Sequence, residues 1–289
     1  MKKETKYEDV GYAFILKILR GIIIFFSKIV GYFKKWEEKI RFQKFKLAFG
    51  ERDDDIYIST YPKSGTTLTQ VILYCLTTDS NMKFNHIYDV SPWIRNASFL
   101  RKQPVDLPSP RIIKTHDEYK DFNKNLKGKI IYVYRDGMDV AVSQFNQQKN
   151  YNAPNLEFDS FLRNFLKSKK WFKHVELWMK NKKHLPILYI RYEDLLRDKR
   201  KEINKIIEFC GIKCSEAAIK KAIKYSDFKY MKANETKFGD QPTEKNKIFN
   251  QFIRKGKSGE GKQKFSDSQV KEFTQLYNEN LKETFDKIF

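Results

Sequence analysis

A short run of β-forming residues, Ile56–Thr60, leads into the loop Tyr61-Pro-Lys-Ser-Gly-Thr-Thr67 and then into the apolar run Leu68–Leu76. The first run suits a strand, and the spacing of the last suits a helix. Free backbone N–H groups at the start of such a helix favour an anion. We therefore predict a strand, a phosphate-binding loop and a helix, although the loop alone would equally suit an ordinary helix cap.

Three further β-forming runs follow, and helical patterns separate them. The predicted strands are Arg111–Thr115, Lys129–Arg135 and Pro186–Arg191, and the predicted helices are Asp139–Gln148, Phe158–Asn181 and Ile203–Cys210. This alternation predicts a single P-loop-like α/β domain with a largely parallel central sheet flanked by helices. Ligands are then expected at the carboxyl ends of the strands. We place the catalytic domain at residues 49–289, after an amphipathic helical extension over residues 1–48.

The extension contains an apolar stretch, Val10–Phe33, which Lys17, Arg20 and Lys28 interrupt. Cations at these positions would be costly at the centre of a bilayer. On a helical wheel they fall in one narrow arc opposite a wide apolar face, a pattern typical of helices lying in an anionic membrane interface. We hypothesise a peripheral membrane anchor over residues 10–36. The alternative is that the apolar face packs on the catalytic domain or on a partner.

The charge of the chain favours an anionic partner. Its 289 residues include 57 Lys and Arg against 36 Asp and Glu, a formal net charge of +21. Nucleic acid, a membrane surface and a polyphosphorylated small molecule all fit this excess. Charge alone does not choose among them.

Three cysteines, Cys75, Cys210 and Cys214, cannot all pair, which favours a reducing compartment and hence the cytoplasm. No second pair of ligands accompanies Cys210 and Cys214, so we expect no zinc site. The loop also departs from the nucleoside-triphosphatase pattern, because Lys63 precedes Gly65 and no earlier glycine opens it. We expect no metal.

The loop at residues 61–67 resembles the 5′-phosphosulfate loop of the cytosolic sulfotransferases that use 3′-phosphoadenosine 5′-phosphosulfate (PAPS), and the resemblance extends over residues 49–289. It implies that PAPS is the donor and adenosine 3′,5′-bisphosphate the product. The residues that it assigns to the 5′ end are Lys63, Ser64, Gly65, Thr66 and Thr67. Those assigned to the 3′-phosphate are Arg135, Ser143, Arg254, Lys255 and Gly256, and those assigned to adenine are Leu68, Tyr192, Ser226 and Phe228.

The same resemblance implies a catalytic set and a reaction. His116 ends a predicted strand, where the family places its catalytic base. Lys63 would stabilise the bridging oxygen of the leaving nucleotide and Lys114 the sulfuryl oxygens, while Ser143 would hold Lys63 off the donor until the acceptor arrives. The implied reaction is direct in-line sulfuryl transfer to a hydroxyl, of EC 2.8.2 type.

Two positions depart from the family pattern. Leu68 stands where a Trp usually stacks on adenine, and Gly261 replaces another Trp in the second 3′-phosphate loop. We expect weaker stacking on adenine and a more mobile loop. The dimer motif of the family is not recognisable around Lys264–Glu272, so the oligomeric state stays open.

Aromatic residues cluster in the segments expected to shape the acceptor pocket, His86–Leu100 and Gln144–Leu156. They are Tyr88, Trp93, Phe99, Phe145 and Tyr151. They favour an apolar or aromatic alcohol or phenol, and a lipid-like acceptor is a weaker alternative. Two rival functions stay open: a P-loop kinase of small molecules, and a non-enzymatic basic protein that binds membranes or nucleic acid. We do not expect nucleic acid to be a partner of the enzyme.

Overall fold

The computed structural model describes residues 4–151, 153–239 and 252–286. The chain separates into two compact units. One consists of Met1–Gly50 with Arg95–Val105, and the other of Glu51–Ile94 with Asp106–Phe289. The four strands all belong to the second unit.

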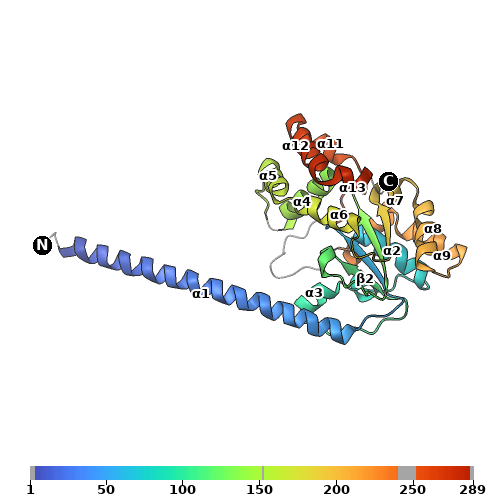
Figure 1. The fold of residues 1–289 in the computed structure, drawn as a ribbon, viewed down its shortest axis with the longest axis horizontal. Helices are drawn as coiled ribbons and strands as arrows, with labels where there is room; N and C mark the ends of the chain where they lie inside the picture. The colour runs from blue at the N-terminus through green and yellow to red at the C-terminus, as the bar shows by residue number, and fades with distance from the viewer. Residues whose placement is uncertain (1–3, 152, 240–251, 287–289) are drawn as a thin grey trace. The chain divides into compact units, whose positions relative to one another are not determined.

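These strands, drawn as arrows in Figure 1, form one parallel sheet. Their order across it is β2-β1-β3-β4. Their bounds are Ile56–Thr60 for β1, Ile112–Thr115 for β2, Lys129–Tyr134 for β3 and Ile187–Arg191 for β4. Central strand β1 pairs Ile58 with Lys114 on one side and with Ile131 on the other. The predicted α/β class and parallel sheet are confirmed.

Side chains alternate between the two faces of the sheet, as the pleat of a strand requires. Ile58 and Ile131 lie on one face, in an apolar cluster with residues of α2 (Thr66–Thr77), α8 (Lys199–Cys210) and α9 (Glu216–Tyr225). On the other face Tyr132 stacks on Trp178 of α6 (Lys170–Lys180), with ring centroids 5.0 Å apart. Because helices cover both faces, the strands are largely apolar and β1 and β2 are fully buried, and the ends of the sheet are left for ligands.

The remaining elements of the second unit are mostly short helices. Their bounds are α2 Thr66–Thr77, α4 Gly137–Tyr151, α5 Phe158–Ser168, α6 Lys170–Lys180, α7 Tyr192–Arg197, α8 Lys199–Cys210, α9 Glu216–Tyr225, α10 Phe228–Ala233, α11 Glu260–Lys264, α12 Asp267–Tyr277 and α13 Glu283–Asp286. Short 3₁₀ turns lie at Ile87–Asp89, Tyr119–Asp121 and Glu235–Lys237, and a π turn at Asn278–Lys282.

The prediction of one helix over Phe158–Asn181 is wrong. The helical conformation is interrupted at Lys169, whose φ of 50° is left-handed. Helix α5 ends before this residue and α6 begins after it. Apolar residues recur at helical spacing on both sides of the break, but the polar run Lys167-Ser-Lys-Lys170 between them interrupts the pattern. Both helices bury aromatic faces, including Phe165 of α5 and Trp171 of α6.

In the first unit, α1 runs without interruption from Glu4 to Phe49. Near its end the Arg41 guanidinium donates to the Ser98 carbonyl at 3.0 Å, and the Arg95 guanidinium lies 4.2 Å from the centroid of the Phe42 ring. These contacts join α1 to α3, Ile94–Phe99. Over the part of the chain that the structure describes, no helix is long and apolar enough to cross a membrane.

Candidate active site

The carboxyl ends of the four strands meet at one edge of the sheet, because all four strands are parallel. A cavity of about 540 Å³ lies there, lined only by residues of the second unit. Of the residues predicted for the site, only Ser64 is absent from its lining; its side chain is fully buried. The predicted residues that line the cavity are Lys63, Gly65, Thr66, Thr67, Leu68, Lys114, His116, Arg135, Ser143, Tyr192, Ser226, Phe228, Arg254, Lys255 and Gly256.

The loop after β1 turns sharply at two residues with left-handed backbone. Lys63 has φ 71°, and Gly65, which caps α2, has φ 103°. A Cβ on Gly65 would come within 2.6 Å of the Tyr192 ring, so only glycine fits. The loop thereby brings the amino terminus of α2, with its unpaired N–H groups, to the cavity. The Lys63 ammonium lies 4.5 Å from the centroid of the Phe252 ring.

The contacts of His116 define which ring nitrogen is free to accept a proton. Its Nδ1 lies 2.9 Å from the Thr60 carbonyl oxygen and 3.1 Å from Thr60 Oγ1. Because a carbonyl oxygen only accepts, Nδ1 carries the hydrogen. The lone pair of the neutral ring is therefore on Nε2, so Nε2 is the nitrogen that can accept a proton as a general base. The Trp93 ring meets the imidazole edge-on at 5.2 Å.

Burial, followed by the nearby Lys114 ammonium, lowers the pKa of His116 to about 3. The imidazole of the nucleotide-free protein is therefore expected to stay neutral down to about pH 5, well below the ordinary histidine value. Nuclear magnetic resonance of histidine-labelled protein, with His116→Ala used to assign the signal, measures this directly. An anionic nucleotide should raise this pKa. Titration of free His116 near pH 6.5 would contradict the expectation.

Lys114 is buried beside two aromatic rings. Its ammonium donates to the Tyr88 hydroxyl at 2.6 Å and lies 4.7 Å and 4.6 Å from the ring centroids of Tyr88 and Trp93. Cation–π contact and a hydrogen bond together keep a charged lysine in a largely apolar wall. Its position follows from β2, which ends at Thr115 and so carries Lys114 and His116 to the same edge.

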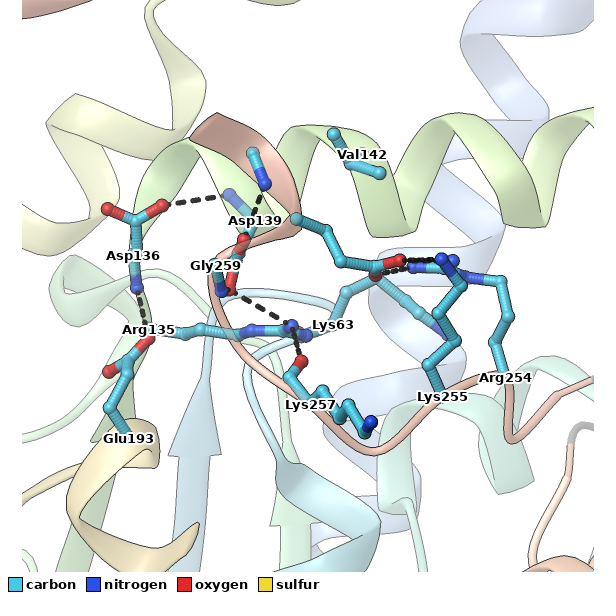
Figure 2. A network of polar contacts seen from close by, with 12 residues as sticks. Lys63, Arg135, Asp136, Asp139, Val142, Glu193, Arg254, Lys255, Lys257 and Gly259 are labelled. Carbon is cyan, nitrogen blue, oxygen red and sulfur yellow. Dashed lines mark hydrogen bonds and ion pairs between the residues drawn. The ribbon is translucent and has the colours of Figure 1, made fainter. Parts of the chain in front are cut away.

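Arg135 connects three segments of the chain that line the cavity (Figure 2). Its guanidinium donates to the carbonyl oxygens of Lys63 and Lys257, each at 3.2 Å, and stacks over the Tyr192 ring at 4.5 Å. Asp139, one turn along the chain in α4, lies 3.4 Å away. Within the described part of the chain, the buried Nε of Arg135 has no hydrogen-bond partner. A donor N–H is thus available to an anionic ligand.

Asp139 also holds the loop that leads into α11. Its two carboxylate oxygens accept from the backbone N–H groups of Gly259, at 2.9 Å, and Gly261, at 2.7 Å. A Cβ on Gly261 would come within 2.4 Å of the Met138 Cβ, so the backbone packs directly on α4. The greater mobility expected from the missing Trp stays a prediction. The loop is attached to α4 through its backbone.

The segment Arg254-Lys255-Gly256 also lines the cavity. Gly256 has φ 60°, and a Cβ there would come within 2.3 Å of the Phe228 ring, which places the phenyl group directly on this backbone. Arg254 and Lys255 both pair with Glu260. The segment therefore brings two cations and a close-packed backbone to the cavity.

The lining of the cavity is strongly cationic. Seven Lys and Arg side chains are present, and only two carboxylates, Asp227 and Glu260, oppose them among the described residues. A polyanionic nucleotide fits this balance, and the available Arg135 Nε fits it as well. Over the same residues no group of His, Cys, Asp and Glu side chains could hold a metal ion.

Comparison with known proteins identifies this architecture. The sulfotransferase domain model matches residues 53–285. The chain belongs to the sulfotransferase family. Mouse sulfotransferase 2B1 is 34% identical, over 80% of this chain and 72% of that protein, and human sulfotransferase 1E1 is 33% identical, over 82% and 87%. The crystal structure of a mouse sulfotransferase complexed with PAP has a TM-score of 0.63 and 26% identity, over 81% of this chain and 87% of that one. The family and reaction class predicted from the sequence are confirmed, and the kinase and non-enzymatic alternatives are dropped.

Not all aromatic residues expected in the acceptor pocket of this sulfotransferase line the cavity. Trp93 does, and Tyr88 contacts Lys114 beside it. Phe145 instead packs on Phe158 of α5, with ring centroids 5.2 Å apart, because it lies on the buried face of α4. Phe99 belongs to the first unit, and 60% of its surface is exposed.

Several lining residues of the sulfotransferase cavity were not found from the sequence. Lys199, at the start of α8, donates to the Ser226 carbonyl at 2.8 Å, and burial lowers its pKa. Gln147 lies one turn after Ser143 on α4, a spacing that could have revealed it. Lys257 and Glu260 lie beside the predicted Arg254–Gly256 segment. No local pattern marks Lys199 as a cavity residue.

Proposed function

We propose that this cavity transfers the sulfuryl group of PAPS to a hydroxyl of an apolar or aromatic small molecule. The observation that carries the proposal is the convergence of His116, Lys63 and Lys114 with the cations Arg135, Arg254 and Lys255, here called the Arg135 wall, around one cavity at the strand ends. The mouse sulfotransferase that shares this fold was crystallised with PAP, the bisphosphate that PAPS leaves behind. The donor would lie between the loop at residues 63–67 and the cations Arg135, Arg254 and Lys255.

The side chains suggest how the reaction proceeds. Nε2 of His116 takes the proton of the acceptor hydroxyl, and the oxygen forms a bond to sulfur. The bond from sulfur to the 5′-phosphate oxygen breaks, and its electron pair stays on that oxygen in adenosine 3′,5′-bisphosphate. Lys63 stabilises this growing negative charge, and Lys114 faces the sulfuryl oxygens. Ser143 shares the cavity with Lys63 and regulates its contact with the donor.

Isothermal titration tests the choice of nucleotide. Adenosine 3′,5′-bisphosphate should bind in the presence of a metal chelator, because the cavity supplies its own cations. ATP with Mg²⁺ should bind at least about tenfold more weakly, since it lacks a 3′-phosphate for the Arg135 wall. Tighter binding of ATP with Mg²⁺ would overturn the proposed function.

The acceptor is proposed from the wall next to the base. Trp93 packs edge-on against His116 and contacts Lys114, so a hydroxyl that reaches Nε2 passes an aromatic surface. Such a wall favours an apolar or aromatic alcohol or phenol over a charged or sugar-like acceptor. We place the reaction in the cytoplasm, in agreement with the name of zebrafish cytosolic sulfotransferase 1, which is 32% identical to this chain.

We also propose that α1 attaches the enzyme to an anionic membrane surface. Fifteen large apolar side chains between Tyr12 and Trp36 are exposed, and cationic residues such as Lys17 and Lys28 lie among them. A helix of this composition binds at the headgroup boundary rather than across the bilayer.

Flotation with liposomes containing phosphatidylserine tests this attachment. The full chain should float with the liposomes, and a chain lacking residues 1–36 should stay at the bottom of the gradient. Liposomes of phosphatidylcholine alone should bind less, because the cations then lack a partner. Equal behaviour of the full and shortened chains would rule the attachment out.

A further inference from the structure

Glu260 lies between the two cations assigned to the 3′-phosphate of the nucleotide. Its carboxylate accepts from both terminal nitrogens of Arg254, one of them at 2.8 Å, and from the Lys255 ammonium at 2.7 Å. An arginine fork that is satisfied by one carboxylate in this bidentate way has the geometry that it would offer to a phosphate. Glu260 thus uses the donors that a terminal phosphate would need.

The position of Glu260 follows from the attachment of its backbone. The neighbouring N–H groups of Gly259 and Gly261 both donate to Asp139, which is buried in α4. Glu260 therefore begins α11 at a fixed place, and its side chain, only 13% exposed, extends toward Arg254. The pairing of Glu260 with Arg254 is therefore held in place by the fold, unlike an ion pair between two mobile surface side chains.

Two anions cannot share these cations without cost. The hydrogen bond from Arg254, aided by Lys255, holds the pKa of Glu260 at about 2, so the carboxylate is charged throughout the neutral range. A bound phosphate must either displace it from Arg254 and Lys255 or lie beside it and be repelled. Lys255, with 58% of its side chain exposed, is able to turn away, whereas Glu260 is confined.

We propose that Glu260 is a residue that sets nucleotide affinity: its carboxylate competes with the 3′-phosphate for Arg254 and Lys255 and thereby limits retention of the bisphosphate product. The inference rests on the proposed function, because it needs a nucleotide with a 3′-phosphate in this cavity. It assigns Glu260 no part in the transfer step itself. Its effect is confined to ligands that carry the 3′-phosphate.

Titration of the full chain with two nucleotides tests this role. For Glu260→Gln, the affinity for adenosine 3′,5′-bisphosphate should rise about tenfold, or about 1.4 kcal/mol, mostly through slower dissociation. The affinity for adenosine 5′-monophosphate, which lacks the 3′-phosphate, should change less than about twofold. Glu216→Gln is the matched control, because Glu216 pairs bidentately with Arg200 at 2.5 and 2.6 Å outside the cavity and its loss changes the net charge equally.

The outcomes separate this inference from the proposed function. Unchanged or weaker binding of the bisphosphate by Glu260→Gln, with wild type still preferring it to the monophosphate, would overturn the inference alone. Equal affinity of wild type for both nucleotides would overturn the proposed function. An equal rise in bisphosphate affinity for Glu216→Gln would also overturn the inference, because the rise would then come from the change in net charge. Glu260→Asp, which keeps the charge but shortens its reach, should give an intermediate rise and serves if Glu260→Gln does not fold.

Discussion

His116→Ala is expected to reduce sulfuryl transfer about a thousandfold or more, because it removes the proposed base, the one histidine among the described residues that line the cavity. Binding of adenosine 3′,5′-bisphosphate should change less than about threefold, since we propose that the phosphate contacts come from the loop at residues 63–67 and from the Arg135 wall. Single-turnover measurement of transfer, combined with titration of the bisphosphate, separates the two effects.

His184→Ala provides the control for this substitution. His184 is exposed on the turn before β4 and has no place in the cavity, so the variant should keep full activity. Thr60→Val tests the orientation of the base, because it removes the hydroxyl contact to Nδ1 and leaves the backbone carbonyl in place. It should lower transfer by less than about tenfold. Near-normal turnover of His116→Ala at neutral pH would show that another group takes the proton.

Asp139→Ala should weaken binding of the bisphosphate by about a hundredfold and also destabilise the fold. The substitution leaves the buried Arg135 without its carboxylate and frees the N–H groups of Gly259 and Gly261 together. Removal of one partner from a buried ion pair costs roughly 3–5 kcal/mol of folding free energy. Denaturant unfolding and nucleotide titration of the same preparation measure both losses.

Asp139→Asn and Asp198→Ala are the comparisons for this prediction. The asparagine keeps the shape of the side chain but accepts through only one oxygen, so its losses should be intermediate. Asp198 caps α8 by accepting from the Lys201 N–H at 3.0 Å, and its removal should cost about 1 kcal/mol without affecting nucleotide affinity. If Asp139→Ala bound the bisphosphate as tightly as wild type, the carboxylate would not organise this wall.

Local sequence was sufficient for much of the fold. The four strands lie within a residue of their predicted bounds, because each is a short β-forming run between clear helical patterns. Parallel pairing then brings His116, Arg135 and Tyr192 to one edge, since each follows the end of a different strand. The convergence of the predicted residues on one cavity therefore needed only the order of the elements.

Contacts between distant segments could not be predicted in this way. Asp139 reaches Gly259 and Gly261 across about 120 residues, and no spacing along the chain marks such a pairing. The break at Lys169 depends on a left-handed residue that is not glycine, which sequence patterns do not favour. The number of aromatic side chains in the acceptor pocket was overestimated for a similar reason. Aromatic composition alone does not tell whether Phe145 of α4 faces the cavity or packs against α5.

Transfer of ³⁵S from labelled PAPS is the most direct test of the proposed reaction. The purified full chain, assayed with a chelator against a panel of phenols, sterols and long-chain alcohols, should place the label on a hydroxyl of at least one of them. Adenosine 3′,5′-bisphosphate should form in equal amount, and His116→Ala should form neither. Absence of labelled organic product from the whole panel, with all label left in PAPS or released as inorganic sulfate, would contradict the proposed function.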